Sequence, residues 1–199
     1  MLDNSNGIRM SRAVAAASAG ALVSSAAPVL LLAEWTGGAG MIVLVYGLGI
    51  TFWLAFYASL RMTGQWAALR APAAKPEVAA LVVSLVYPAQ WYAVYPVARG
   101  EAALIMTSVV GAASICVAVA LISRVWHWPA LLAMLAWSVV SVCGDLQVTA
   151  NGPGWPHLET HLEWFWFLVR WQVPQAALAA AWLVRARRLP RQTHGGAAC

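Results

Sequence analysis

The chain alternates between long apolar runs and short polar stretches. Each apolar run is about 20 residues long, which is the length that an α-helix needs to cross the hydrocarbon core of a bilayer. The runs cover residues 13–33, 39–60, 77–97, 102–123, 125–146 and 162–184. The pattern therefore predicts an all-α fold, a polytopic transmembrane bundle of about six helices.

The polar stretches leave little room for anything besides this bundle. Residues 147–161 (QVTANGPGWPHLETH) contain Gly and Pro residues that prevent a continuous helix. Residues 1–190 are interpreted as a single transmembrane helical domain, and residues 191–199 are expected to be a disordered tail. A signal peptide is the alternative for residues 13–33, but that run is long for one, so we favour a retained first helix.

Composition and charge agree with this picture. Of 199 residues, 62% are hydrophobic and 10% are charged, whereas a soluble domain has about a quarter of its residues charged. With the N-terminus inside, most basic residues lie on the cytoplasmic side, as the positive-inside rule requires. These residues are Arg9, Arg12, Arg61, Arg70, Lys75, Arg124, Arg185, Arg187, Arg188 and Arg191. We therefore expect a multi-pass protein of the bacterial cell membrane, with both ends cytoplasmic, the lipid bilayer as its partner and no role for nucleic acid.

Four of the 12 tryptophans fall near the middle of a predicted span: Trp53, Trp91, Trp137 and Trp171. An indole N–H at that depth requires a hydrogen-bond partner or a cavity. Helical spacing places Tyr57 on the same face as Trp53, and Tyr87 and Tyr95 on the face of Trp91. Packing between helices explains these rings as well as a shared, aromatic-lined pocket for an apolar ligand does, and the sequence leaves both explanations open.

Ionisable residues also occur within or at the ends of the last two runs. Arg170 lies about 12 Å into the final span, where a guanidinium is expected to face the bundle interior and to pair. Asp145 and Glu163 are the candidate partners, and such a pair could simply hold two helices together. Alternatively, a carboxyl group that faces an apolar pocket has a raised pKa and stays protonated, ready to donate a proton. Pro174 additionally frees a backbone carbonyl nearby.

No metal or cofactor is predicted. His157 and His161 have the spacing of a helical metal-binding pair, but that pair alone is a weak signal, and an exposed amphipathic helix start is the favoured explanation. The sequence contains no Asp-rich metal–diphosphate motif, P-loop, dinucleotide fingerprint, GxSxG or HExxH.

One stretch resembles a known family. Pro88-Ala-Gln-Trp91-Tyr92-Ala-Val-Tyr95, which follows Tyr57-Ala-Ser-Leu-Arg61, is similar to the Asn-x-x-Trp-Glu-x-x-Tyr pattern of the integral-membrane terpene cyclases of fungal meroterpenoid and bacterial drimentine-type pathways. Trp91 and Tyr95 match that pattern. Tyr92 stands where the family has its acid, and Pro88 where it has Asn. The resemblance covers about 40 residues, and the family tends to have seven helices.

The resemblance implies a terpene cyclase of secondary metabolite biosynthesis, an isomerase- or lyase-type enzyme that protonates and cyclises a prenylated small molecule without a metal. Asp145 or Glu163 is then the expected catalytic proton donor. The expected substrate-binding residues are Trp53, Tyr57, Tyr87, Trp91, Tyr92, Tyr95, Trp137, Arg170 and Trp171. A small transporter or exporter of an apolar compound and a non-catalytic membrane subunit are the alternatives.

Overall fold

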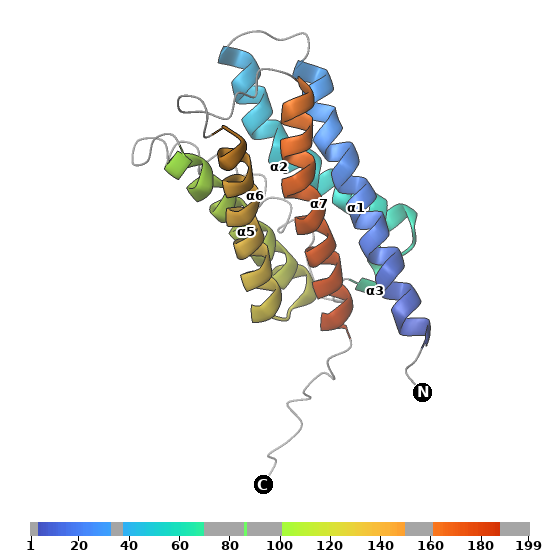
Figure 1. The fold of residues 1–199 in the computed structure, drawn as a ribbon. Coiled ribbons are helices and arrows are strands. Elements are labelled where there is room, and N and C mark those ends of the chain that lie inside the picture. Colours follow the sequence, from blue (N-terminus) through green and yellow to red (C-terminus); the bar gives the residue numbers. More distant parts are fainter. Residues whose placement is uncertain (1–3, 33–37, 70–85, 87–100, 150–160, 188–199) are drawn as a thin grey trace.

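The fold is that of a helical bundle (Figure 1). The structure, a computed structural model, describes residues 4–32, 38–69, 86, 101–149 and 161–187. The long helices in this part of the chain are α1 (Asn4–Leu32), α2 (Gly38–Met62), α5 (Glu101–Ser123), α6 (Trp128–Thr149) and α7 (His161–Ala186), and α3 (Trp66–Leu69) is a single turn. The described residues form helices and no strand, so the predicted all-α class is confirmed for them.

Helix α7 lies at the centre of the arrangement. It packs against α1 on one side and against α5 and α6 on the other, while α2 packs on α1. Helices α1 and α6 run from the lower to the upper end of the bundle in Figure 1, and α2, α5 and α7 run the opposite way. The start of α1 and the end of α7 therefore lie at the same end.

Small residues let α1 approach its neighbours closely. Ala13, Ala17 and Ala21 recur at helical spacing on α1 and are fully buried. A Cβ atom at Gly20 would lie 2.6 Å from the carbonyl oxygen of Ala55 on α2, so the two backbones are nearly in contact. This small-residue packing is typical of helices in membranes, where backbones must approach closely to gain dispersion energy.

Only part of the expected six-span topology is established. Within the described residues, one segment, the 19 residues Ile105–Ser123 of α5, is long and apolar enough to cross a membrane. The apolar part of α6, Trp128–Cys143, is shorter. Residues 77–97 and 191–199 lie outside the described residues, apart from Val86, which is helical. The third span and the disordered tail stay predictions.

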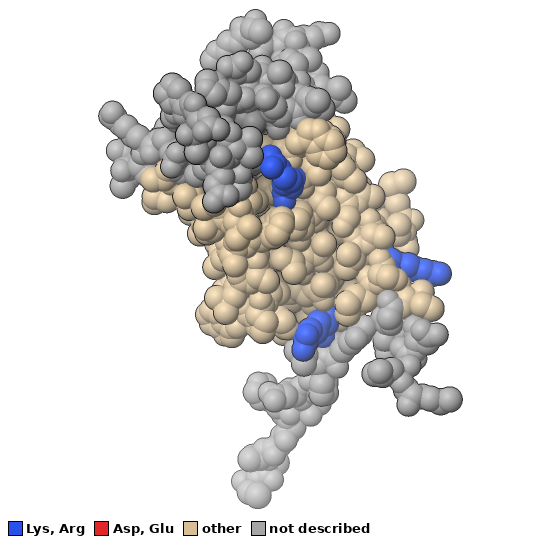
Figure 2. Space-filling model, in the orientation of Figure 1, with Lys and Arg blue, Asp and Glu red and all other residues tan. Residues whose placement is uncertain are grey.

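Charge is distributed unevenly along the bundle. Six of the seven arginines with described side chains lie at the lower end in Figure 1, at the start of α1 or at or just beyond the ends of α2, α5 and α7. They are Arg9, Arg12, Arg61, Arg124, Arg185 and Arg187. Figure 2 shows basic side chains on one face of the molecule, separated by uncharged surface.

Candidate functional site

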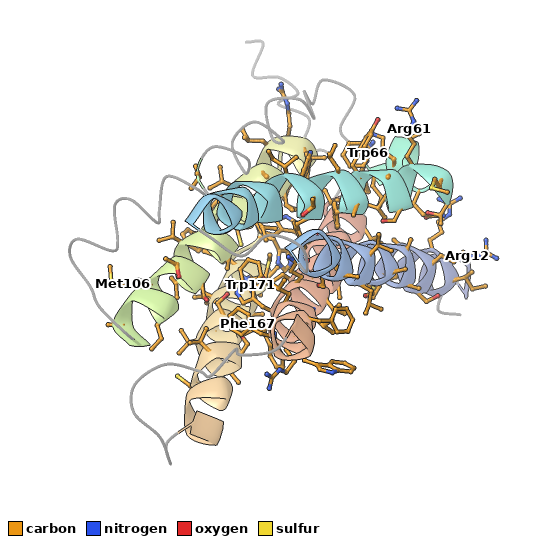
Figure 3. The ribbon with its side chains drawn as sticks, turned by 90° about the horizontal axis from the view of Figure 1, so that it is seen from above. Arg12, Arg61, Trp66, Met106, Phe167 and Trp171 are labelled. Atoms are coloured by element: carbon orange, nitrogen blue, oxygen red, sulfur yellow. The ribbon has the colours of Figure 1, made fainter. Side chains whose placement is uncertain are left out.

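The predicted aromatic residues differ in how deeply they are buried. Trp53 on α2 and Trp171 on α7 are buried, with 3% and 5% of their surfaces exposed, and Trp171 lies within the bundle in Figure 3. Trp53 stacks on Phe56 of its own helix, with ring centroids 5.8 Å apart. Trp137 on α6 is 37% exposed. Whether these rings line one pocket with Trp91 stays a prediction, because Trp91 lies outside the described residues.

The exposed ring of Trp137 on α6 donates a hydrogen bond to the backbone of α7. Pro174 lies inside α7 and has no N–H, so the carbonyl of Arg170, four residues earlier, loses its helical hydrogen bond. The indole Nε1 of Trp137 donates to that carbonyl oxygen at 2.9 Å. A side chain of one helix thus satisfies the backbone group that proline leaves open in the other.

The side chain of Arg170 does not face the interior. It is exposed, and its Nε donates to the carbonyl oxygen of Trp166 on the preceding turn at 3.4 Å. The expectation of an inward-facing guanidinium is therefore wrong. The long aliphatic stem lets the charged group turn back along the outside of α7, whereas hydropathy alone indicates only how deep the Cα atom lies.

Two glutamines of α7 form the buried polar centre of the described bundle. Gln172 accepts a hydrogen bond of 3.1 Å from Ser25 of α1 through its Oε1. Gln175 donates through Nε2 to the carbonyl oxygen of Met134 at 2.9 Å and to Oγ of Ser138 at 2.8 Å, both on α6. These bonds connect α1, α7 and α6 across the interior. The sequence shows both glutamines as neutral polar groups, but it does not reveal the serines that they contact.

The polar centre contains one unsatisfied atom. Gln175 is fully buried, and its Oε1 accepts no hydrogen bond from any group in the described part of the chain. A buried amide oxygen without a donor costs about 1–3 kcal/mol, and the cost is greater in an apolar medium than near water. The interface between α6 and α7 therefore contains a buried acceptor that has no donor among the described residues.

Tyr57 belongs to a different region, the lower end of α2. Its hydroxyl accepts a hydrogen bond from Nη1 of Arg61, and the guanidinium carbon of Arg61 lies 5.8 Å from the tyrosine ring centroid. The ring also packs edge-on against Trp66 of α3, with ring centroids 4.7 Å apart. Among the described residues, Tyr57 thus contacts groups at the end of the bundle, one helical turn below Trp53.

The remaining predicted site residues are six in number. Tyr87, Trp91, Tyr92 and Tyr95 lie outside the described residues. Asp145 lies on α6 and Glu163 on α7, but their side chains are not among the described ones. The described residues contain no group of three or more His, Cys, Asp or Glu side chains that could hold a metal ion.

Comparison with known protein families, with curated proteins and with solved structures finds no match for this chain. Function must therefore be argued from the chemistry of the residues themselves.

Proposed function

We propose that the chain is a multi-pass membrane protein with both ends in the cytoplasm. The clustering of six arginines at one end of the bundle supports this orientation, because cytoplasmic ends carry the excess of basic residues. The directions of the helices support an even number of crossings. Helices α2 and α5 both run toward the arginine-rich end, and the sequence between them contains the apolar run 77–97, which is long enough to return the chain to the other side.

Within this framework, we propose that the protein cyclises a prenylated small molecule by protonation. The observation that carries the proposal is the burial of Trp53 and Trp171 in mid-helix, together with the two hydrogen-bonded glutamines that follow Trp171 on α7. A carbocation is stabilised by aromatic faces, and each desolvated ring contributes about 2 kcal/mol. An interior that combines buried indoles with fixed polar groups suits such chemistry better than a purely aliphatic bundle does.

The proposed reaction needs only acid–base groups of the chain. A protonated carboxyl, Asp145 or Glu163, transfers its proton to the terminal carbon–carbon double bond of the prenyl chain. The resulting cation is attacked by an internal double bond, which closes a ring. Loss of a proton from a neighbouring carbon then forms the product and restores the proton balance. The product is an isomer of the substrate with one double bond fewer for each ring formed.

The test is co-expression with an enzyme that farnesylates a small aromatic acceptor, followed by chromatography and mass spectrometry of the product. A cyclised isomer of unchanged mass is expected with the wild-type chain. Asp145→Asn or Glu163→Gln should lower its yield at least 100-fold, because a positioned general acid contributes about 10²–10⁴ to the rate. Asp3→Asn, which removes a carboxyl group directly before α1 in the sequence, should leave the yield unchanged. Linear product alone with wild-type protein would eliminate the cyclase.

Transport of an apolar compound is the second candidate, and Pro174 favours it. Many transporters bind their substrates near mid-bilayer, where helices are discontinuous. Helix α7 is continuous, but Pro174 removes one of its backbone hydrogen bonds beside the polar groups Gln172 and Gln175. In the same co-expression experiment, a transporter would leave the linear product chemically unchanged. It would raise the fraction of that product found in the medium.

A further inference from the structure

The arginine-rich end of the bundle carries a short hydrogen-bonded turn that leads into α3. The C-terminus of α2 ends in a Schellman motif, in which Gln65 N–H bonds to Leu60 O at 2.9 Å and Gly64 N–H bonds to Arg61 O at 3.0 Å. Gly64 adopts the left-handed conformation, with φ of 70°. This turn leads the chain directly into α3 at the end of the bundle (Figure 1).

Two buried side chains hold α3 against the bundle. Trp66 and Leu69, at opposite ends of this single turn, are 6% and 5% exposed. Trp66 packs edge-on against Tyr57. Apolar contacts of Trp66 and Leu69 therefore fix α3 against the end of the bundle.

One exposed arginine lies at each end of this turn. Arg61 is held next to Trp66 through Tyr57, whose hydroxyl accepts from its Nη1. Arg187, at the end of α7, donates from its Nε to the carbonyl oxygen of Leu69 at 3.2 Å. Figure 3 shows Arg61 beside Trp66 at the end of α2. Each guanidinium is thus positioned by a neutral group, which leaves its positive charge uncompensated by these contacts.

We infer that Arg61 and Arg187, on either side of α3, form a binding site for the phosphate of an anionic phospholipid. Arginines that are pre-positioned at the level of an interfacial tryptophan are suited to a headgroup, since guanidinium nitrogens match phosphate oxygens and little side-chain entropy remains to be lost. In the proposed orientation, this end meets the cytoplasmic leaflet, where a basic residue near the surface contributes about 1 kcal/mol to binding of anionic lipid. The inference depends on the proposed membrane location and not on the proposed activity.

Native mass spectrometry of the full chain, purified in a neutral detergent, tests this site. Phosphatidylglycerol should bind at least tenfold more tightly than phosphatidylcholine. The double variant Arg61→Gln/Arg187→Gln should weaken phosphatidylglycerol binding roughly 20- to 30-fold, which is the loss of two such contributions. The matched control Arg9→Gln/Arg12→Gln removes the same charge from the same end of the bundle, and it should weaken binding less than about fivefold.

Three outcomes would overturn the site. Equal losses in the two double variants would mean that only overall charge matters. Displacement of the lipid by millimolar inorganic phosphate would indicate a site for a free anion. A wild-type chain that binds the two lipids equally would have no anionic headgroup site. Arg61→Lys/Arg187→Lys keeps both charges, and it should retain binding within about fivefold, so the inference can be tested even if the glutamine variant fails to fold. A wild-type chain that is soluble without detergent would refute the membrane location instead.

Discussion

Trp137 of α6 donates a hydrogen bond from its indole nitrogen to the backbone carbonyl of Arg170 on α7, at 2.9 Å. That carbonyl is the one that Pro174 deprives of its partner within the helix. The hydrogen bond that α7 lacks at this carbonyl is therefore replaced by one from another helix. It follows that α6 and α7 are coupled through this contact, and that the contribution of Trp137 to stability depends on the proline.

Replacement of Trp137 by Phe keeps an aromatic ring but removes the donor. We expect Trp137→Phe to lower the free energy of unfolding by about 1–3 kcal/mol, because the carbonyl of Arg170 is left without this bond. In a Pro174→Ala background, the alanine N–H restores the helical hydrogen bond, and the same substitution should cost at least 1 kcal/mol less. Denaturant titration of the four proteins in detergent, followed by circular dichroism, measures the coupling. Equal costs in the two backgrounds would contradict the role assigned to the indole.

Hydropathy located the described helices well but not their ends. Residues 102–123 were expected to be helical, and α5 spans Glu101–Ser123. By contrast, α1 begins at Asn4 and not at residue 13, because a helix can continue through polar residues such as Arg9 and Arg12 outside the apolar span. Helix α6 begins at Trp128 and not at residue 125. Arg124 takes a positive φ of 56°, and Nδ1 of His127 accepts from Ala130 N–H at 3.1 Å as the cap of α6.

Side-chain partners were less accessible to prediction than helices. The proline rule predicted that a carbonyl near Arg170 would be free, but only the register between α6 and α7 identifies Trp137 as its donor. Trp182 is likewise 1% exposed and donates to the carbonyl of Val125 at 3.2 Å, a partner that its spacing along α7 does not reveal. Both partners are hidden from the sequence for the same reason. Sequence spacing defines a face of a helix, and the neighbouring helices determine what that face meets.

The close approach of α1 and α2 makes a strong prediction for Gly20. Any side chain there would collide with the carbonyl oxygen of Ala55 and with Oγ of Ser59, since even a Cβ atom would lie 2.6 Å from both. Gly20→Leu should therefore separate the two helices and lower the free energy of unfolding by about 1–3 kcal/mol or more. Ala19→Leu, at the adjacent exposed position, should change it by less than about 0.5 kcal/mol. Comparable melting temperatures for both variants in detergent would argue against this packing.

The unsatisfied oxygen of Gln175 leads to an unusual expectation for a buried polar residue. Gln175→Leu removes two hydrogen bonds, but it also removes the unpaired Oε1, and these effects largely cancel. We expect a change of less than about 1 kcal/mol in the free energy of unfolding. Ser138→Ala removes the hydroxyl that Gln175 contacts. The double variant Gln175→Leu/Ser138→Ala should therefore have a free energy of unfolding equal to or higher than that of the wild type. A loss above about 3 kcal/mol from Gln175→Leu alone would show that Oε1 has a strong partner, such as an internal water molecule.

The opposite placement of the end of α2 and the start of α5 predicts the topology of the chain. Gln65 follows α2 at the arginine-rich end, whereas α5 begins with Glu101 at the other end. A reporter inserted after Gln65 should be active only if it functions in the cytoplasm, and one inserted after Gly100 only if it functions outside. Paired fusions to alkaline phosphatase and to a green fluorescent protein measure this directly, and fusions at both termini should report the cytoplasm. If the insertions after Gln65 and Gly100 reported the same compartment, no span would cross between them, and the arginine-rich end could not be cytoplasmic throughout.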